Sequence, residues 1–233
     1  MQQHGVKTIG YIGFSDGWGD QVLAATKHYA QADGIKILAD ERYARTDTSA
    51  EAQALKLISV HPQAIMMGNS ATPAALPVVA LRRFGYKGGI YGNHGIVSPA
   101  FIKVGGAAVS GVIADTSPLV VYNQLPDGNA VKPVAAAFMA EYAKKFGAQS
   151  VNPFAGYSYD AMLLLKNAIP AALKAGQPGT EAFRVALRDA LEKTHGLVGV
   201  SGVYDMSPTN HNGQDSRAAV LVEVKDGAWK AIH

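Results

Sequence analysis

Cysteine is absent from the 233 residues of this sequence. Its absence excludes disulfide bonds, thiolate metal sites and a cysteine nucleophile. It suits an oxidising compartment without establishing one. The seven histidines form no H-x-x-x-H pair and no cluster with acidic residues at metal-ligand spacing. We therefore expect neither a metal site nor a cofactor.

Long hydrophobic runs are missing as well. No apolar stretch reaches the roughly 18 residues that a membrane-spanning helix needs. The first residues, Met1–Gly5, lack the basic and apolar regions of a signal peptide. Because the chain starts almost directly in a predicted strand, we expect that an N-terminal portion of a longer protein is missing.

Charge is sparse and scattered. Charged residues make up 17 %, and 21 basic and 18 acidic side chains give a net charge of +3. Basic residues are adjacent only at Arg82-Arg83 and Lys144-Lys145. The sequence therefore shows no cluster of basic residues of the kind that binds nucleic acid. The hydrophobic content of 48 % is enough for a packed core.

Short apolar runs fill the first half of the sequence, and each is followed by a helical pattern or a turn. They are Thr8–Ile12, Ile35–Ala39, Ala64–Met67, Gly89–Tyr91 and Val109–Ala114. This alternation predicts an α/β fold with a parallel sheet flanked by helices. Such sheets bind ligands beyond the carboxyl ends of their strands, so the residues after each run are the first functional candidates.

The alternation of strands and helices ends at Thr116-Ser117-Pro118, a segment that interrupts regular secondary structure. Three helical segments without a clear strand between them are predicted at about Ala130–Phe146, Phe154–Leu173 and Thr180–Lys193. Their apolar faces need a partner surface. The end returns to β-structure, with strands predicted at Gly202–Met206, Arg217–Lys225 and Ala228–Ile232 and a hairpin turn at Asp226-Gly227.

Four residues at the expected carboxyl edge of the sheet suggest a small binding site. Trp18 starts the first helix, Asn69 and Ser70 follow the third run, and His94 follows the fourth. An aromatic side chain at the rim of a cleft offers a flat apolar wall, and the other three offer hydrogen bonds. No paired carboxylates occur there, so these residues include no acid and base pair of the kind that general acid–base catalysis uses.

Two short motifs in the first turn favour other functions. Gly13–Gly17 fits G-x-S-x-G, the nucleophile elbow of α/β hydrolases, with Ser15 as nucleophile. The other members of a triad would be His195 or His211 and an acid such as Asp160 or Asp189. The simpler interpretation is a strand-to-helix turn that Ser15 and Asp16 cap.

Gly17-Trp18-Gly19 resembles the start of a dinucleotide-binding fingerprint. Val22 stands where that fingerprint has its third glycine, and the glycines follow several residues after the strand. We therefore expect that the tight turn and the close helix–strand approach are not encoded.

Several segments, taken in order, resemble the branched-chain amino-acid type (type I) of periplasmic binding proteins. They are Gly5–Gly19, Phe84–Gly89, Asn93–Gly95, Phe101–Gly106, Tyr157–Ala161, Phe183–Leu191 and Asp205–Gly213. Trp18 stands in the aromatic place of that family's D-x-Y-G turn. The resemblance implies a two-lobed clamp without catalysis, which delivers a small solute in the periplasm to the membrane permease of an ABC importer.

The resemblance also implies a division of the chain. Residues 1–115 with 200–233 would form the second ligand-binding lobe, and 116–199 a partial, mostly helical first lobe. Asp115, Thr116, Ser117 and Pro118 would form the hinge. The opening sheet of the first lobe has no counterpart, which implies truncation at the N-terminus. Helices left without that sheet predict self-association of the chain.

The ligand prediction rests on a resemblance to one branch of the family and on one departure from the family pattern. Asn93–Gly95 and Ser207–Gly213 look most like the branch that binds aromatic carboxylates, such as benzoate. Amino-acid-binding members hold the ligand ammonium with an acid after the fourth strand, where this chain has His94. An imidazole can donate to a carboxylate. We predict an organic acid, such as an aromatic carboxylate, packed on Trp18 and lined by Asn69, Ser70, Ala71 and His94. Three alternatives stay open: an amino-acid-binding protein of the same family, a hydrolase using Ser15, and the sensor lobe of a receptor.

Overall fold

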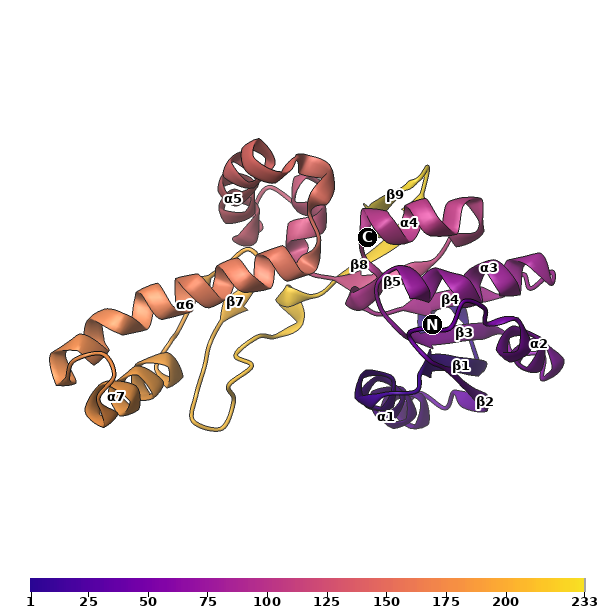
Figure 1. Ribbon diagram of the computed structural model, residues 1–233, viewed down its shortest axis with the longest axis horizontal. Coiled ribbons are helices and arrows are strands. Elements are labelled where there is room, and N and C mark those ends of the chain that lie inside the picture. Colours follow the sequence, from indigo (N-terminus) through magenta and orange to yellow (C-terminus); the bar gives the residue numbers. More distant parts are fainter. Residues whose placement is uncertain (233) are drawn as a thin grey trace. The chain divides into compact units, whose positions relative to one another are not determined.

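The computed structural model describes residues 1–232, which fold into two compact units (Figure 1). Unit 1 consists of Met1–Asp115 and the C-terminal segment from Leu221, and unit 2 is Thr116–Val220. The chain thus leaves the first unit after Asp115, and it returns at Leu221 rather than at 200. Residues 200–220 lie in unit 2 because the strand within 202–206 pairs there in a separate two-stranded sheet.

Unit 1 is built on a seven-stranded sheet with the order β2-β1-β3-β4-β5-β8-β9. The strands are β1 (Thr8–Phe14), β2 (Lys36–Tyr43), β3 (Ala64–Gly68), β4 (Gly89–Gly92), β5 (Ile113–Thr116), β8 (Val220–Lys225) and β9 (Ala228–Ala231). Neighbours from β2 to β5 pair in parallel, and β8 and β9 form an antiparallel hairpin. The predicted α/β class and its parallel sheet are confirmed.

Four α-helices flank this sheet. They are α1 (Gly17–Ala32), α2 (Glu51–Ser59), α3 (Ala75–Arg83) and α4 (Pro99–Gly105). Single turns of 3-10 helix lie at Gln2–His4, Thr72–Ala74, His94–Ile96 and Gly106–Val109. The connection through α1 runs from β1 toward β2, opposite to the direction of the later connections. Right-handed crossovers therefore place α1 on one face of the sheet and α2, α3 and α4 on the other.

The fifth strand differs from the sequence prediction. It spans Ile113–Thr116, whereas Val109–Ala114 was expected. Gly111 has φ +77°, a left-handed conformation that interrupts an extended chain, and its N–H donates to the carbonyl oxygen of Val224. Val109 is fully buried but ends a 3-10 turn. Burial alone therefore made this stretch resemble a strand.

The turn from β1 into α1 depends on a close approach at Gly19. A Cβ built on Gly19 would lie only 2.0 Å from the Phe14 carbonyl oxygen. The Tyr11 hydroxyl donates to the Gly19 carbonyl oxygen at 2.6 Å. Our expectation that the sequence does not encode a close helix–strand approach was wrong, because Gly19 provides it in place of the glycine missing at Val22.

Unit 2 is mostly helical. Its helices are α5 (Val131–Phe146), α6 (Pro153–Ala175) and α7 (Glu181–Glu192), with 3-10 turns at Pro118–Gln124, Ala148–Ser150 and Ser216–Ala218. The short strands β6 (Leu197–Val198) and β7 (Val203–Tyr204) form its two-stranded sheet. The buried cluster is Leu119, Val131, Ala135, Met139 and Val200. All three predicted helices are present, and Thr180 caps α7 as expected by accepting from the Phe183 N–H.

A buried carboxylate joins α6 to the β6–β7 loop within unit 2. Asp160 has no exposed surface. It accepts hydrogen bonds from the N–H groups of Val200 at 2.7 Å and Ser201 at 2.8 Å, and from the Tyr204 hydroxyl at 3.0 Å. Burial, together with this carboxylate, raises the pKa of Tyr204. Asp160, which the sequence offered as a triad acid, is thus occupied by three donors.

Helix α7 buries none of its residues. Its apolar side chains Leu187 and Leu191 line a groove of about 470 Å³ together with Met206. The self-association predicted from such uncovered faces stays a prediction. No helix within residues 1–232 combines the length and the apolar character needed to cross a membrane.

Candidate functional site

The candidate site lies in unit 1, where the first four parallel strands end. Trp18 follows β1, Ser70 follows β3, and His94 follows β4. The Trp18 and His94 rings meet edge to face, with centroids 5.5 Å apart and planes at 86°. A Cβ built on Gly95 would lie 2.8 Å from Cβ of Ser70 and 3.2 Å from Cζ2 of Trp18. Three residues that are distant in sequence therefore surround one point.

The indole nitrogen of Trp18 and the imidazole of His94 determine which ligand groups this site can bind. The indole Nε1 of Trp18 is buried and has no hydrogen-bond partner within the described chain. Such an unpaired donor is costly unless a ligand satisfies it. On the other side, Nδ1 of His94 lies 3.8 Å from Oδ2 of Asp115. The site thus combines an aromatic wall, an unsatisfied donor and an imidazole beside a carboxylate.

Asn69 is buried just after β3. Its side chain is fully buried, and its Nδ2 donates to the Tyr43 hydroxyl at 3.0 Å. Oδ1 of Asn69 has no partner within residues 1–232. Desolvation raises the pKa of Tyr43, although the Asn69 hydrogen bond lowers it. The predicted contact of Asn69 with ligand stays a prediction.

Asn93 was missed by the sequence analysis, and it holds the loops of the site together. Its Nδ2 donates to the carbonyl oxygens of Met67 and Asn69, and its Oδ1 accepts from the Gly95 N–H at 2.8 Å. The sequence signals for it are its place directly after β4 and the Asn93–Gly95 segment of the family resemblance, but the prediction selected His94 instead.

Ala71 adopts a backbone conformation that is rare for residues other than glycine, with φ 56° and ψ −157°. Strain of this kind costs about 1–3 kcal/mol and persists where surrounding contacts enforce it. Here the Ala71 N–H donates to the carbonyl oxygen of Gly95 at 2.8 Å. The strained residue is therefore tied to the loop that carries His94.

Arg45 is a second residue that the sequence analysis missed. It lies just beyond β2, and its Nε contacts Oδ2 of Asp16 at 2.5 Å. Its Nη1 donates to Oγ of Ser70 at 3.1 Å, and its Cζ lies 4.2 Å from the ring centroid of Phe14. Candidate residues were selected after the predicted strands. The same rule would have found Arg45 if the second strand, predicted to end at Ala39, had been followed to its end at Tyr43.

Asp16 caps α1 as expected. Its Oδ1 accepts from the N–H groups of Trp18 at 3.0 Å and Gly19 at 3.1 Å. The hydrogen bond from Gly19, together with the contact to Arg45, lowers the pKa of the Asp16 carboxyl. The cap therefore fixes the helical turn that carries Trp18.

Asp16→Ala should destabilise the protein by about 1 kcal/mol, the usual cost of losing an N-cap. Because the pKa of Asp16 is lower in the folded state, its contribution is complete above the unfolded pKa of about 3.9 and is lost as pH falls through the folded value. Urea unfolding at pH 7 and below pH 4 measures both effects. Asp16→Asn is the matched control, since it keeps the cap without the titration. The unmodified chain should lose more stability than Asp16→Asn as the pH falls below 4. An equal pH dependence in the unmodified chain and in Asp16→Asn would contradict this role.

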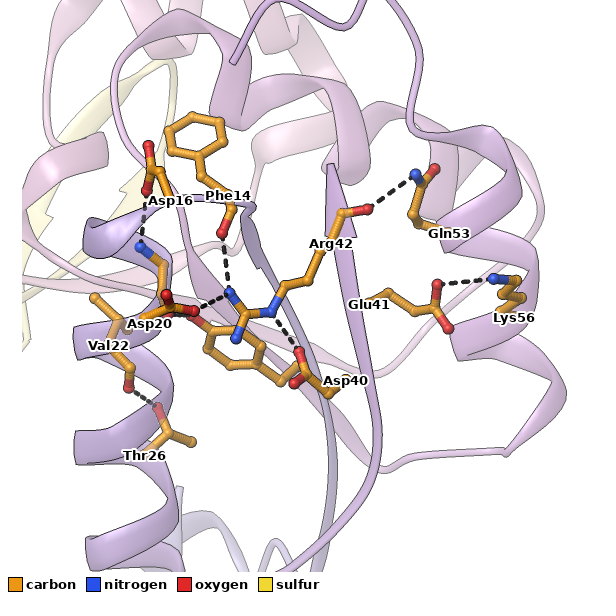
Figure 2. Close-up of polar contacts among 12 residues, drawn as sticks. Phe14, Asp16, Asp20, Val22, Thr26, Asp40, Glu41, Arg42, Gln53 and Lys56 are labelled. Carbon is orange, nitrogen blue, oxygen red and sulfur yellow. Dashed lines mark hydrogen bonds and ion pairs between the residues drawn. The ribbon is translucent and has the colours of Figure 1, made fainter. Parts of the chain in front are cut away.

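Figure 2 shows the neighbouring polar network, which is centred on Arg42 of β2. Arg42 donates through Nη1 to the Phe14 carbonyl oxygen at 2.9 Å and to Asp20 at 3.1 Å, and through Nε to Asp40 at 2.6 Å (Figure 2). Its Cζ lies 5.2 Å from the ring centroid of Tyr11. These contacts join β2 to β1 and α1 beneath the site, so Arg42 supports the scaffold.

A groove of about 800 Å³ opens next to the Trp18–His94 pair, entirely within unit 1. At one end it is lined by Trp18, Asn93, His94 and Asp115. It continues along α1 over apolar side chains, among them Ile9, Val22, Ala30, Ile35 and Met66. A mostly apolar groove with a few polar groups at one end is typical of small-molecule sites.

The structure gives no catalytic partner to Ser15 within the described residues. Ser15 is exposed, and its backbone N–H donates to the Tyr43 carbonyl oxygen. No histidine among residues 1–232 forms a hydrogen bond with its hydroxyl, which an activated serine requires. Nor does that part of the chain gather three or more side chains suited to a metal ion.

The unit boundary falls between Asp115 and Thr116, inside the segment predicted as a hinge. Thr116 and Ser117 are buried, and their hydroxyl oxygens have no hydrogen-bond partner within residues 1–232. The structure describes a single arrangement of this segment, so its hinge role stays a prediction.

An open, mostly parallel sheet with aromatic and polar side chains beyond its strand ends is typical of α/β ligand-binding proteins. The sequence model of one family, described as periplasmic binding protein, matches residues 1–228. The chain therefore belongs to the periplasmic binding protein family. Members of this family bind small-molecule solutes and work with the permeases of ABC transporters.

Solved structures agree with this assignment. An extracellular ligand-binding receptor from Rhodopseudomonas palustris is 40% identical with a TM-score of 0.96, and the match covers 100% of this chain and 65% of the receptor. A proposed branched-chain amino acid ABC transporter from Rhodospirillum rubrum is 27% identical with a TM-score of 0.74, covering 99% and 62%. A leucine-binding protein from Thermotoga maritima, at 24% identity and a TM-score of 0.80, covers 99% and 61% and shows the same fold.

The chain thus spans about two thirds of the length of these structures. The search of curated proteins finds no match to it.

Proposed function

We propose that this chain is the solute-binding component of an ABC importer and that it holds a small organic acid at the carboxyl edge of unit 1. The observation that carries the proposal is the edge-to-face pair of Trp18 and His94 beside an apolar groove. Trp18 offers an aromatic wall for the apolar body of the solute, and His94 offers a donor for its carboxylate.

The charges at the edge support an acid over an amino acid. His94 stands where amino-acid-binding relatives place the acid for the ligand ammonium. Both oxygens of Asp16 already accept hydrogen bonds, from backbone N–H groups and from Arg45. Asp115 faces His94. The remaining polar groups favour a ligand that accepts hydrogen bonds, and the aromatic wall favours an aromatic carboxylate.

The proposal also states the cellular compartment and the protein partner. The chain would work in the periplasm, bind solute without chemical change and deliver it to a membrane permease. Asp115–Pro118 would allow the lobes to close on the solute. Family membership and the extracellular and ABC-transporter relatives support these points.

A branched-chain or other amino acid is the second candidate ligand. The relatives from Rhodospirillum rubrum and Thermotoga maritima, which are named for branched-chain amino acids and leucine, favour it. Ser70 and Asp115 would then have to bind the ammonium group.

Calorimetric titration of the unmodified chain with benzoate and with leucine separates the two candidates. We expect binding of benzoate and none of leucine. Trp18→Ala should weaken benzoate binding about tenfold to a hundredfold, because loss of an aromatic contact costs about 1.5–3 kcal/mol. Trp18→Phe should keep most of the affinity.

Leu55→Ala is the control for general damage, since Leu55 is an exposed apolar residue on α2. Its benzoate affinity should equal that of the unmodified chain. Tight binding of leucine without binding of benzoate would replace the proposed ligand by the second candidate. Equal benzoate affinity in Trp18→Ala would remove Trp18 from the site.

A further inference from the structure

We propose that Arg45 makes this edge of unit 1 selective for anions and thereby determines that the bound solute carries a carboxylate. The inference rests on the proposed function and extends it to a residue outside the predicted set. It is carried by the contacts of one guanidinium group, on the loop after β2, with the loops that follow β1 and β3.

The guanidinium of Arg45 connects the loops that follow β1, β2 and β3. Nε contacts Oδ2 of Asp16, the residue that caps α1, and Nη1 donates to Oγ of Ser70. The group also lies flat enough over Phe14 to place Cζ 4.2 Å from the ring centroid. These contacts hold the charge of Arg45 beside the turn that carries Trp18.

Donors remain on Arg45 after these contacts, whereas each oxygen of Asp16 already accepts at least one hydrogen bond. A guanidinium has five N–H donors and cannot lose its charge in a protein. Nη2 of Arg45 makes no hydrogen bond or ion pair with any of residues 1–232. The side chain is 47% exposed, so these donors are accessible. Asp16, in contrast, has both carboxylate oxygens in use.

The unused donors of Arg45 favour an anionic ligand group at the carboxyl edge of unit 1. A carboxylate can reach the remaining N–H groups of Arg45, and charge-assisted bonds of this kind are about twice as strong as neutral ones. An ammonium group next to Arg45 meets a fixed positive charge, and the charge of Asp16 is already paired with that arginine. The other acidic groups near this edge, Asp47 and Asp115, contact the Ala44 N–H and His94 respectively.

Arg42 shows by comparison why Arg45 stands out. Both arginines belong to the β2 region and both contact aspartates. Arg42 is only 22% exposed and donates to two aspartates and a backbone carbonyl oxygen. Arg45 is more exposed, and its contacts involve side chains of the site itself.

The first test measures the sign of the field at Trp18 without any ligand. Trp229→Phe leaves Trp18 as the single tryptophan, because the sequence contains two. Iodide and caesium then quench its fluorescence as an anionic and a cationic probe. Arg45→Gln should lower the ratio of the iodide to the caesium quenching constant about twofold, the size expected for one screened charge at close range.

Arg83→Gln in the same background is the matched control, since Arg83 is an exposed arginine in an ion pair with Glu51 between α2 and α3. Its quenching ratio should equal that of the parent. An unchanged ratio in Arg45→Gln would overturn the inference. Circular dichroism of each variant verifies that the fold is kept.

The second test separates charge from shape with benzoate, the neutral benzamide and the cationic benzylamine. Arg45→Gln should weaken benzoate binding at least about tenfold and change benzamide binding less than about threefold. Arg45→Lys should recover part of the benzoate affinity, because it keeps the charge but loses the planar fork. Equal losses for benzoate and benzamide would overturn the inference, as would no loss for either.

The two tests also distinguish this inference from the proposed function. If the unmodified chain binds none of the three compounds, the proposed ligand class fails. The quenching ratio then decides by itself whether Arg45 gives the edge its preference for anions.

Discussion

Gly19→Ala is expected to lower the free energy of unfolding by about 3 kcal/mol or more, a large value for one methyl group. The added Cβ would lie 2.0 Å from the Phe14 carbonyl oxygen and 2.9 Å from its backbone nitrogen. Backbone atoms cannot rotate away as side chains do, so α1 has to move from β1. That movement breaks the Tyr11–Gly19 hydrogen bond. Urea unfolding followed by tryptophan fluorescence measures the change, since Trp18 and Trp229 both lie in unit 1.

Gly17→Ala is the matched control for this experiment. Gly17 begins the same helix, yet a Cβ built on it meets no atom within 4 Å. Alanine is the better helix former, so this variant should be neutral or slightly more stable. Equal losses in both variants would show that backbone flexibility of the turn matters, and not the close approach at Gly19.

Asp160→Asn should cost about 3 kcal/mol of unfolding free energy, because it removes a buried acceptor shared by three donors. Asparagine has one acceptor oxygen, and its NH₂ group would face an N–H or O–H donor. At least one of the Val200 N–H, the Ser201 N–H and the Tyr204 hydroxyl then lacks a partner. Far-ultraviolet circular dichroism during urea unfolding reports the loss.

Asp189→Asn provides the comparison for Asp160. Asp189 is an exposed carboxylate on α7 that is paired with Arg188. Exposed ion pairs contribute about 0–1 kcal/mol, so this substitution should change stability little. A similar small effect at Asp160 would mean that the β6–β7 loop is held by other contacts.

The fold could be predicted from the sequence wherever local pattern and local caps act together. Alternating apolar runs indicated the parallel strands, and Asp16 and Thr180 each cap the helix that was expected to start beside them. The second helix, in contrast, begins at Glu51 after Ala50, without a side-chain cap. Short-range signals of this kind depend on a few neighbouring residues, which is why they could be read.

Positions that depend on distant segments could not be predicted. Asn69 turned inward because Tyr43, from another strand, supplies a hydrogen-bond partner. The role of Arg45 depends on Asp16 and Ser70, which the sequence separates by 29 and 25 positions. In sequence it looks like any solvated arginine.

The strand order of unit 1 has a consequence for synthesis of the protein. Strand β5 neighbours β8 in the sheet, and all of unit 2 lies between them in the chain. At ribosomal rates of about 5–20 residues per second, roughly 5–20 s pass before β8 is made. During that time the nascent chain exposes an open edge at β5, where unwanted pairing with other chains can begin. A chaperone that shields this edge would therefore raise the yield of soluble protein.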